Sequence, residues 1–145
     1  MLEGETVQLI SAGNYLGEQT VSNGSIELPH GFPVVTLGLP ITSTVTPMPI
    51  DVNGLGVSAK SRVVDATLSF YNTVGGKYGI GTDLYEIPAR NTGDDLNESP
   101  PLFTGLKEVS FNGTNVRDAT ITIVQDKPFP MTLRGITYNL DANEG

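Results

Sequence analysis

Side chains that could perform catalysis are few in this chain. The only histidine is His30, in a Pro-His-Gly turn, and there is no cysteine. A Ser/Cys-His-Asp hydrolase needs a histidine beside its nucleophile, and a zinc site needs several cysteine or histidine ligands. We therefore expect no catalytic residue, no metal site and no cofactor, and we interpret His30 as a surface residue.

Three acidic residues form the next candidate site. Asp94, Asp95 and Glu98 could bind a hard cation or act as the paired carboxylates of a glycoside hydrolase. They lie in a polar stretch bounded by proline, residues 89–101, which predicts a mobile surface loop. Since no rigid scaffold for a carboxylate pair is visible, we favour a solvated surface and do not expect an enzyme.

Two glycine-containing segments match binding motifs by letter but not by context. Residues 51–54 (DVNG) begin like a calcium loop, yet Arg62 stands where the bidentate glutamate belongs. Residues 54–59 (GLGVSA) match G-x-G-x-x-A, whose glycines bring a helix N-terminus against a pyrophosphate. The residues that follow alternate like a strand, so no helix would face the phosphate. We interpret both segments as turns.

Strands are the elements expected to position all these residues. The 145 residues are 38% hydrophobic, enough for one compact core, while 17 glycines and 10 prolines leave little room for helices. Alternation is clearest over residues 62–71, which predicts one buried face with Val64, Ala66, Leu68 and Phe70. Further strands are expected over residues 6–10, 18–21, 25–28, 32–39, 106–111, 119–124 and 131–140. The predicted fold class is all-β, an antiparallel β-sandwich or barrel with a small N-terminal β-hairpin module.

The turn residues suggest how the chain is divided. Asn23-Gly24 between two β-prone runs predicts a hairpin in a small N-terminal module, residues 1–30, followed by the sandwich or barrel, residues 31–145. Gly75-Gly76 predicts a second hairpin. Residues 41–52 contain two prolines and are expected at a sheet edge or in an extended arm.

The charge distribution limits the classes of partner. Sixteen acidic and eight basic side chains give a net charge of −8, and no basic cluster occurs, so we expect no specific nucleic-acid binding. The chain has no apolar run long enough to span a membrane, and its acidic start differs from a secretory signal. Because strand pattern begins almost at once, we expect the chain to be one domain of a longer protein.

Several short motifs resemble the C-terminal region of bacteriophage tail nozzle, or tail-hub, proteins, which are virion proteins of short-tailed phages. The matching segments, in order, are residues 35–43 (VTLGLPITS), 60–64 (KSRVV), 101–105 (PLFTG), 107–109 (KEV) and 124–131 (VQDKPFPM). Residues 1–30 are similar to the end of the small β-module that precedes this region. One departure is Ile41, where the family pattern has tyrosine.

The resemblance implies a structural role in the virion, after assembly in the cytoplasm of the host bacterium. Identical subunits would form a ring around the DNA channel, and the partners would be neighbouring nozzle subunits, the adaptor, and fibres or spikes. A carbohydrate- or receptor-binding β-sandwich is the second interpretation, with Tyr71, Tyr78 or Tyr85 stacking on sugar rings. The low aromatic content, 7% with no tryptophan, weighs against it.

Interface residues are predicted where large apolar side chains accompany proline in loops. These residues are Leu39, Pro40, Pro101, Leu102 and Phe103. Such side chains are plausible docking points, although most large apolar residues in a domain are simply buried in its core. The alternative of ordinary core closure therefore stays open for each of them.

Overall fold

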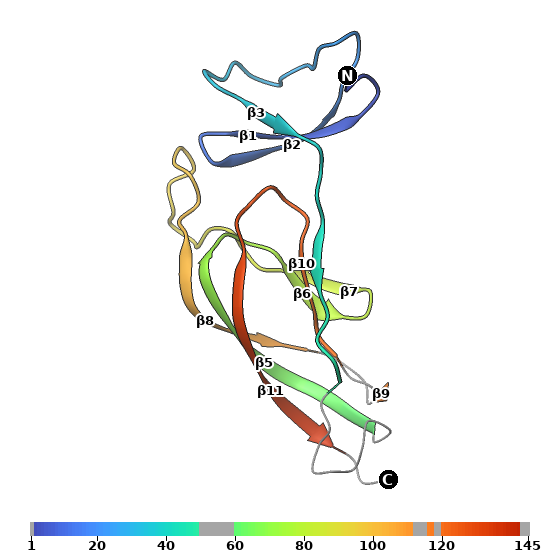
Figure 1. Ribbon diagram of the computed structural model, residues 1–145. Coiled ribbons are helices and arrows are strands. Elements are labelled where there is room, and N and C mark those ends of the chain that lie inside the picture. Colours follow the sequence, from blue (N-terminus) through green and yellow to red (C-terminus); the bar gives the residue numbers. More distant parts are fainter. Residues whose placement is uncertain (1, 50–59, 112–115, 118–119, 143–145) are drawn as a thin grey trace.

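The computed structural model describes residues 2–49, 60–111, 116–117 and 120–142. These residues form eleven strands and no helix, and the strands build three antiparallel sheets. The prediction of an all-β antiparallel fold is thereby confirmed. In Figure 1 the small N-terminal sheet lies at one end of an elongated molecule, and the two larger sheets make up the rest.

The N-terminal sheet has the strand order β2-β1-β3, with bounds Thr6–Ser11 for β1, Asn14–Thr20 for β2 and Thr36–Gly38 for β3. Ala12 and Gly13 both have positive φ, 48° and 75°, as a two-residue hairpin turn between twisted strands requires. Val7 and Leu9 of β1 are fully buried and pack with Val21. This module therefore has a small apolar core of its own.

The Asn23-Gly24 turn forms, but the hairpin expected around it does not. Both residues have positive φ, and Ser22 and Ser25 exchange two backbone hydrogen bonds of 2.9 and 3.0 Å. The pairing ends after this single bridge, so residues 25–28 form no strand. The strand expected over residues 32–39 is likewise only the short, exposed β3.

The sequence predicts a boundary between two modules after residue 30, which places β3 in the second module. This strand pairs with β1 through Gln8↔Gly38, Leu9↔Leu37 and Ile10↔Thr36, so the three-stranded sheet draws on residues on both sides of that boundary. β3 is exposed because it covers one edge of the sheet and does not enter a core.

The remaining strands form two sheets that pack as a sandwich. One sheet has the order β4-β10-β6-β7, and the other has the order β11-β5-β8, with β9 also paired to β5. The strand bounds are Ser43–Val45 (β4), Lys60–Thr73 (β5), Lys77–Ile80 (β6), Asp83–Glu86 (β7), Phe103–Ser110 (β8), Val116–Arg117 (β9), Thr122–Gln125 (β10) and Thr132–Ala142 (β11). β4 lies at a sheet edge, as predicted for the proline-containing segment 41–52, of which residues 50–52 lie outside the described residues.

The sandwich core is centred on β5, the middle strand of its sheet. Val63, Leu68 and Phe70 of β5 pack with Ile121 and Ile123 from the opposite side. Each of these large side chains contributes about 1.5–3 kcal/mol by leaving water. The predicted buried face holds from residue 66 onward but not before it: Val63 is buried in place of Val64. A register shift in the pairing with β11, between Asn139 and Leu140, accompanies this change of face.

Gly75-Gly76 does not turn a hairpin. β5 and β6, which these residues connect, belong to different sheets, so the glycines carry the chain from one layer of the sandwich to the other. Their φ values of 61° and 114° explain why glycine is needed there. The hairpin in this region is formed by β6 and β7 around Gly81.

Candidate interaction surface

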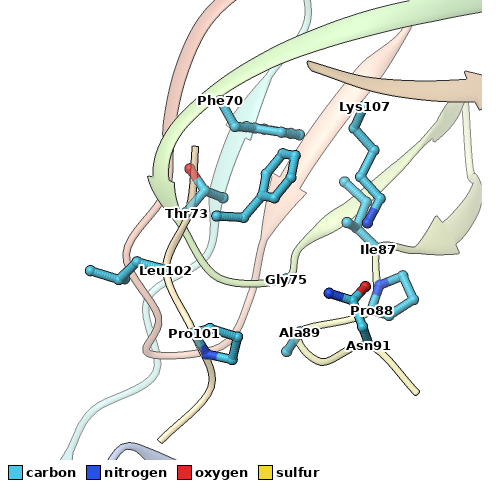
Figure 2. A pocket seen from close by; sticks show the side chains of 11 residues that line it. Phe70, Thr73, Gly75, Ile87, Pro88, Ala89, Asn91, Pro101, Leu102 and Lys107 are labelled. Carbon is cyan, nitrogen blue, oxygen red and sulfur yellow. The ribbon is translucent and has the colours of Figure 1, made fainter. Parts of the chain in front are cut away.

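A pocket of about 170 Å³ opens beside β8, at the end of the sandwich nearer the N-terminal sheet. We call it the β8 pocket. Its lining residues, all drawn in Figure 2, are Phe70, Thr73, Gly75, Ile87, Pro88, Ala89, Asn91, Pro101, Leu102, Phe103 and Lys107. Most of these residues are apolar, while Thr73, Asn91 and Lys107 add polar surface, so the pocket suits an apolar group that carries a polar group beside it.

Lys107 supplies the positive charge of the β8 pocket. It extends from β8 toward Ile87 and Pro88 in Figure 2, and its Nζ atom lies 5.6 Å from the centroid of the Phe103 ring. Within the described residues Lys107 forms no ion pair. An ammonium over an aromatic face beside an apolar hollow can attract a carboxylate that arrives with an apolar group.

Thr73, another polar residue of the pocket, already has partners. Thr73 is buried, its hydroxyl donates to the carbonyl oxygen of Tyr71 over 3.1 Å, and it accepts a hydrogen bond of 3.0 Å from the Thr132 amide. Lys107 is therefore the charged group left to meet an incoming ligand.

Exposed apolar residues continue from the pocket along the open edge of β8. Leu102 is 57% exposed, and Leu106, on the solvent side of the strand, is 71% exposed. Among the described strands β8 pairs only with β5, so its other edge carries backbone groups that no described strand pairs. Such an edge can pair with another chain.

The predicted interface residues fall into two separate places. Pro101, Leu102 and Phe103 line the β8 pocket, whereas Leu39 borders a different hollow of about 220 Å³ at the end of β10, and Pro40 follows it in the connection to β4. All five are exposed, so none of them closes the core. Sequence reasoning missed Lys107 and Phe70, because their place in the pocket depends on the pairing of β5 with β8.

Arg90 stabilises the loop formed by residues 89–101, both ends of which line the β8 pocket. Its guanidinium donates to the carbonyl oxygens of Asp95, over 2.6 Å, and of Glu98, and also to the side-chain oxygen of Asn14 in the N-terminal sheet. The carboxylate of Asp94 accepts the Asn91 amide over 2.6 Å. Asp94 and Asp95 thus organise the loop, as short acidic side chains commonly do in turns.

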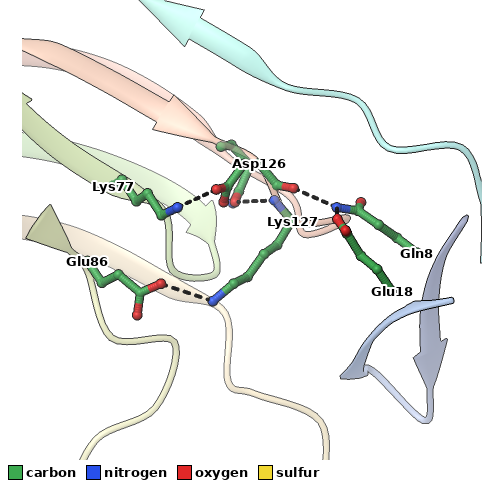
Figure 3. Close-up of polar contacts among 7 residues, drawn as sticks. Gln8, Glu18, Lys77, Glu86, Asp126 and Lys127 are labelled. Carbon is green, nitrogen blue, oxygen red and sulfur yellow. Dashed lines mark hydrogen bonds and ion pairs between the residues drawn. The ribbon is translucent and has the colours of Figure 1, made fainter. Parts of the chain in front are cut away.

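A network of polar side chains joins the N-terminal sheet to the sandwich (Figure 3). The side-chain amide of Gln8 donates to the carbonyl oxygen of Asp126 over 2.9 Å and to Glu18 over 3.1 Å. Asp126 forms an ion pair with Lys77, and this hydrogen bond raises the pKa of Lys77. Lys127 pairs with Glu86 over 3.3 Å.

Aromatic contacts accompany this polar network. The rings of Tyr15 and Phe129 meet edge to face with centroids 6.3 Å apart, and Lys127 lies over the Tyr15 ring at 5.9 Å. Burial raises the pKa of Tyr15. A hydrogen bond, an aromatic pair and a cation–π contact therefore connect the two parts of the molecule.

The remaining candidates from the sequence are dispersed. His30 is exposed in its turn. Tyr71 lies on β5, while Tyr78 and Tyr85 face each other across β6 and β7 with centroids 5.7 Å apart, so the three tyrosines belong to two different sheets. The two motifs within residues 51–59 lie outside the described residues.

The described ranges contain no helix that could cross a membrane. In the same ranges there is no group of three or more histidine, cysteine, aspartate or glutamate side chains placed to hold a metal ion. No protein-family model matches the chain, and no curated protein does.

Proposed function

We propose that this chain is a structural module of a short-tailed phage, and that it assembles with copies of itself into the nozzle ring around the DNA channel. The resemblance of residues 35–43, 60–64, 101–105, 107–109 and 124–131 to nozzle proteins supports this role. The observation that carries the proposal is the open edge of β8, where Leu102, Phe103 and Leu106 are exposed.

Physical reasoning connects this edge to ring assembly. A contact between two different surfaces of identical subunits generates a ring when the rotation closes. Strand edges and apolar residues left open in a monomer become paired and buried in such a ring. The net charge of −8 supports the location around DNA, because an acidic channel repels phosphate and lets the duplex pass without adhering.

The test measures the mass of the chain in solution by analytical ultracentrifugation over rising concentrations, with electron microscopy of the heaviest species. We expect closed rings, and we expect Leu106→Lys to weaken their assembly. Val34→Lys is the matched control, since Val34 and Leu106 are both 71% exposed and Val34 lies away from β8. A chain that remains monomeric up to about 1 mM, the concentration at which even weak specific contacts form, would contradict the proposal.

Binding to DNA gives an independent test. A channel module of this charge should show no measurable affinity for duplex DNA at physiological salt. Nanomolar affinity in a fluorescence anisotropy titration would exclude a passive channel lining.

A further inference from the structure

The β8 pocket has the size of one side chain. Cavities of roughly 150 Å³ hold a benzene-sized group, whereas sites for drug-sized ligands begin at about 300 Å³. At about 170 Å³, the pocket is suited to a single leucine- or phenylalanine-sized group. Lys107 at its side, which has no ion-pair partner among the described residues, adds a preference for a carboxylate close to that group.

The loop beside the pocket presents a matching group. Leu96 is 77% exposed, the highest exposure of any described leucine. Asp95 precedes it in sequence, and Glu98 follows two positions later. An exposed leucine among carboxylates is the complement of an apolar pocket with one ammonium.

The loop is held in place by contacts that fix its backbone. Arg90 binds the carbonyl oxygens of Asp95 and Glu98, on both sides of Leu96. The turn between β1 and β2 packs directly on the loop, since a Cβ atom added to Gly13 would lie 2.3 Å from the Cβ atom of Ser99. Leu96 is thus exposed on a loop whose backbone is held by hydrogen bonds, and such support lowers the entropy cost of binding through it.

We propose that Leu96 of one copy enters the β8 pocket of a neighbouring copy, with the carboxylates around it facing Lys107. Within a single copy Leu96 does not line the pocket, although both ends of its loop do. Leu96 and the pocket are different surfaces, so the contact joins unlike faces of two subunits, as a ring requires. This inference rests on the proposed function, because it requires that copies of the chain meet.

Disulfide cross-linking tests the contact directly, because the chain has no cysteine of its own. The variants Leu96→Cys and Leu102→Cys, each made separately, are mixed under mild oxidation. We expect the mixed 96–102 disulfide to form about tenfold faster than in a control mixture of Tyr85→Cys with Leu102→Cys, because the contact raises the local concentration of the two thiols. Tyr85 is 46% exposed and lies on the other sheet. Equal rates in the two mixtures would overturn the inference.

Charge reversal tests the role of Lys107. Lys107→Glu should slow the 96–102 cross-link, and combining it with Glu98→Lys on the Leu96→Cys partner should restore the rate, because the Glu98 carbonyl oxygen and not its carboxylate binds Arg90. Leu96→Asp should weaken self-association about tenfold to a hundredfold, the loss expected for one buried leucine. If the unmodified chain forms rings while the cross-link shows no preference, the inference fails and the proposed function stands. If the chain stays monomeric and the cross-link shows no preference, both fail.

Discussion

The side-chain amide of Gln8 donates a hydrogen bond of 2.9 Å to the backbone carbonyl of Asp126, a residue 118 positions later in the chain. The same amide group donates to the carboxylate of Glu18, and Gln8 is only 5% exposed. This one buried group therefore connects β1, β2 and the end of β10. It fixes the N-terminal sheet to the sandwich by hydrogen bonds that water cannot easily replace.

Replacing Gln8 should weaken this connection. We expect Gln8→Ala to lower the free energy of unfolding by about 1–3 kcal/mol, because it leaves the Asp126 carbonyl and Glu18 without their donor. Gln8→Glu should lower the free energy of unfolding by at least as much, because its carboxylate would face two other acceptors, the Glu18 carboxylate and the Asp126 carbonyl oxygen. Urea unfolding measures both, and Gln19→Ala, next in β2 to Glu18, is the control. A Gln8→Ala variant as stable as the control would show that the two parts are not coupled through this residue.

Tyr138 carries a buried hydroxyl without a hydrogen-bond partner among the described residues. Burial also raises the pKa of this phenol. Tyr138→Phe keeps the ring in the core and removes the unsatisfied group, so we expect it to raise the free energy of unfolding by roughly 1 kcal/mol. Tyr138→Leu, which loses part of the ring packing, should lower it. Thermal unfolding distinguishes the two, and a destabilising Tyr138→Phe would reveal a partner for the hydroxyl.

Gly79 of β6 lies opposite Leu84 of β7. A Cβ atom added there would lie 1.9 Å from the carbonyl oxygen of Asp83, which is backbone and cannot simply move aside. Gly79→Ala should therefore destabilise the protein by about 3 kcal/mol, as overpacking of a dense site does. Gly38→Ala is the control in β3, with nothing within 4 Å of the added atom. Similar stability of both variants in urea unfolding would contradict the close approach.

The ion pair of Lys77 with Asp126 predicts a dependence of stability on alkaline pH. The hydrogen bond to Asp126 raises the pKa of Lys77 above its ordinary value of 10.5. The folded state thus holds the Lys77 proton more tightly than the unfolded state does. The resulting stabilisation is fully present below pH 10.5, and it is lost as the pH rises through the pKa of Lys77 in the folded state. The stability difference between the unmodified chain and Lys77→Met should therefore shrink above pH 10.5.

Tyrosine ionisation must be separated from this effect. Burial raises the pKa of Tyr15 and of Tyr138, and a raised tyrosine pKa also makes stability fall at alkaline pH. Both tyrosines are present in the unmodified chain and in Lys77→Met, so the difference between the two unfolding curves isolates the lysine. A difference that stays constant from neutral pH to about pH 12, beyond the ordinary lysine range, would show that the ion pair contributes nothing.

The local sequence pattern was sufficient to predict several local features of the fold. The alternation of residues 66–70 predicts the buried face of β5, and the positive φ of Asn23 and Gly24 follows from residue types that tolerate it. The same local reasoning failed at Gly75-Gly76, because a glycine pair that allows a hairpin allows a crossing between sheets equally well. It also failed at Val63 and Val64, where a register shift exchanged the two faces.

What the sequence alone determined is the class of the molecule: an acidic, cysteine-free chain of short alternating strands, with proline and glycine marking where each strand stops. Only the tertiary structure decided which strands pair, and with them the surface that can bind a partner. Phe70, Ile87 and Lys107 lie far apart in the sequence and meet in one pocket because β5 and β8 pair while the chain after β7 folds back beside them. Pairing between distant strands depends on packing of the whole chain, which no short window of residues contains.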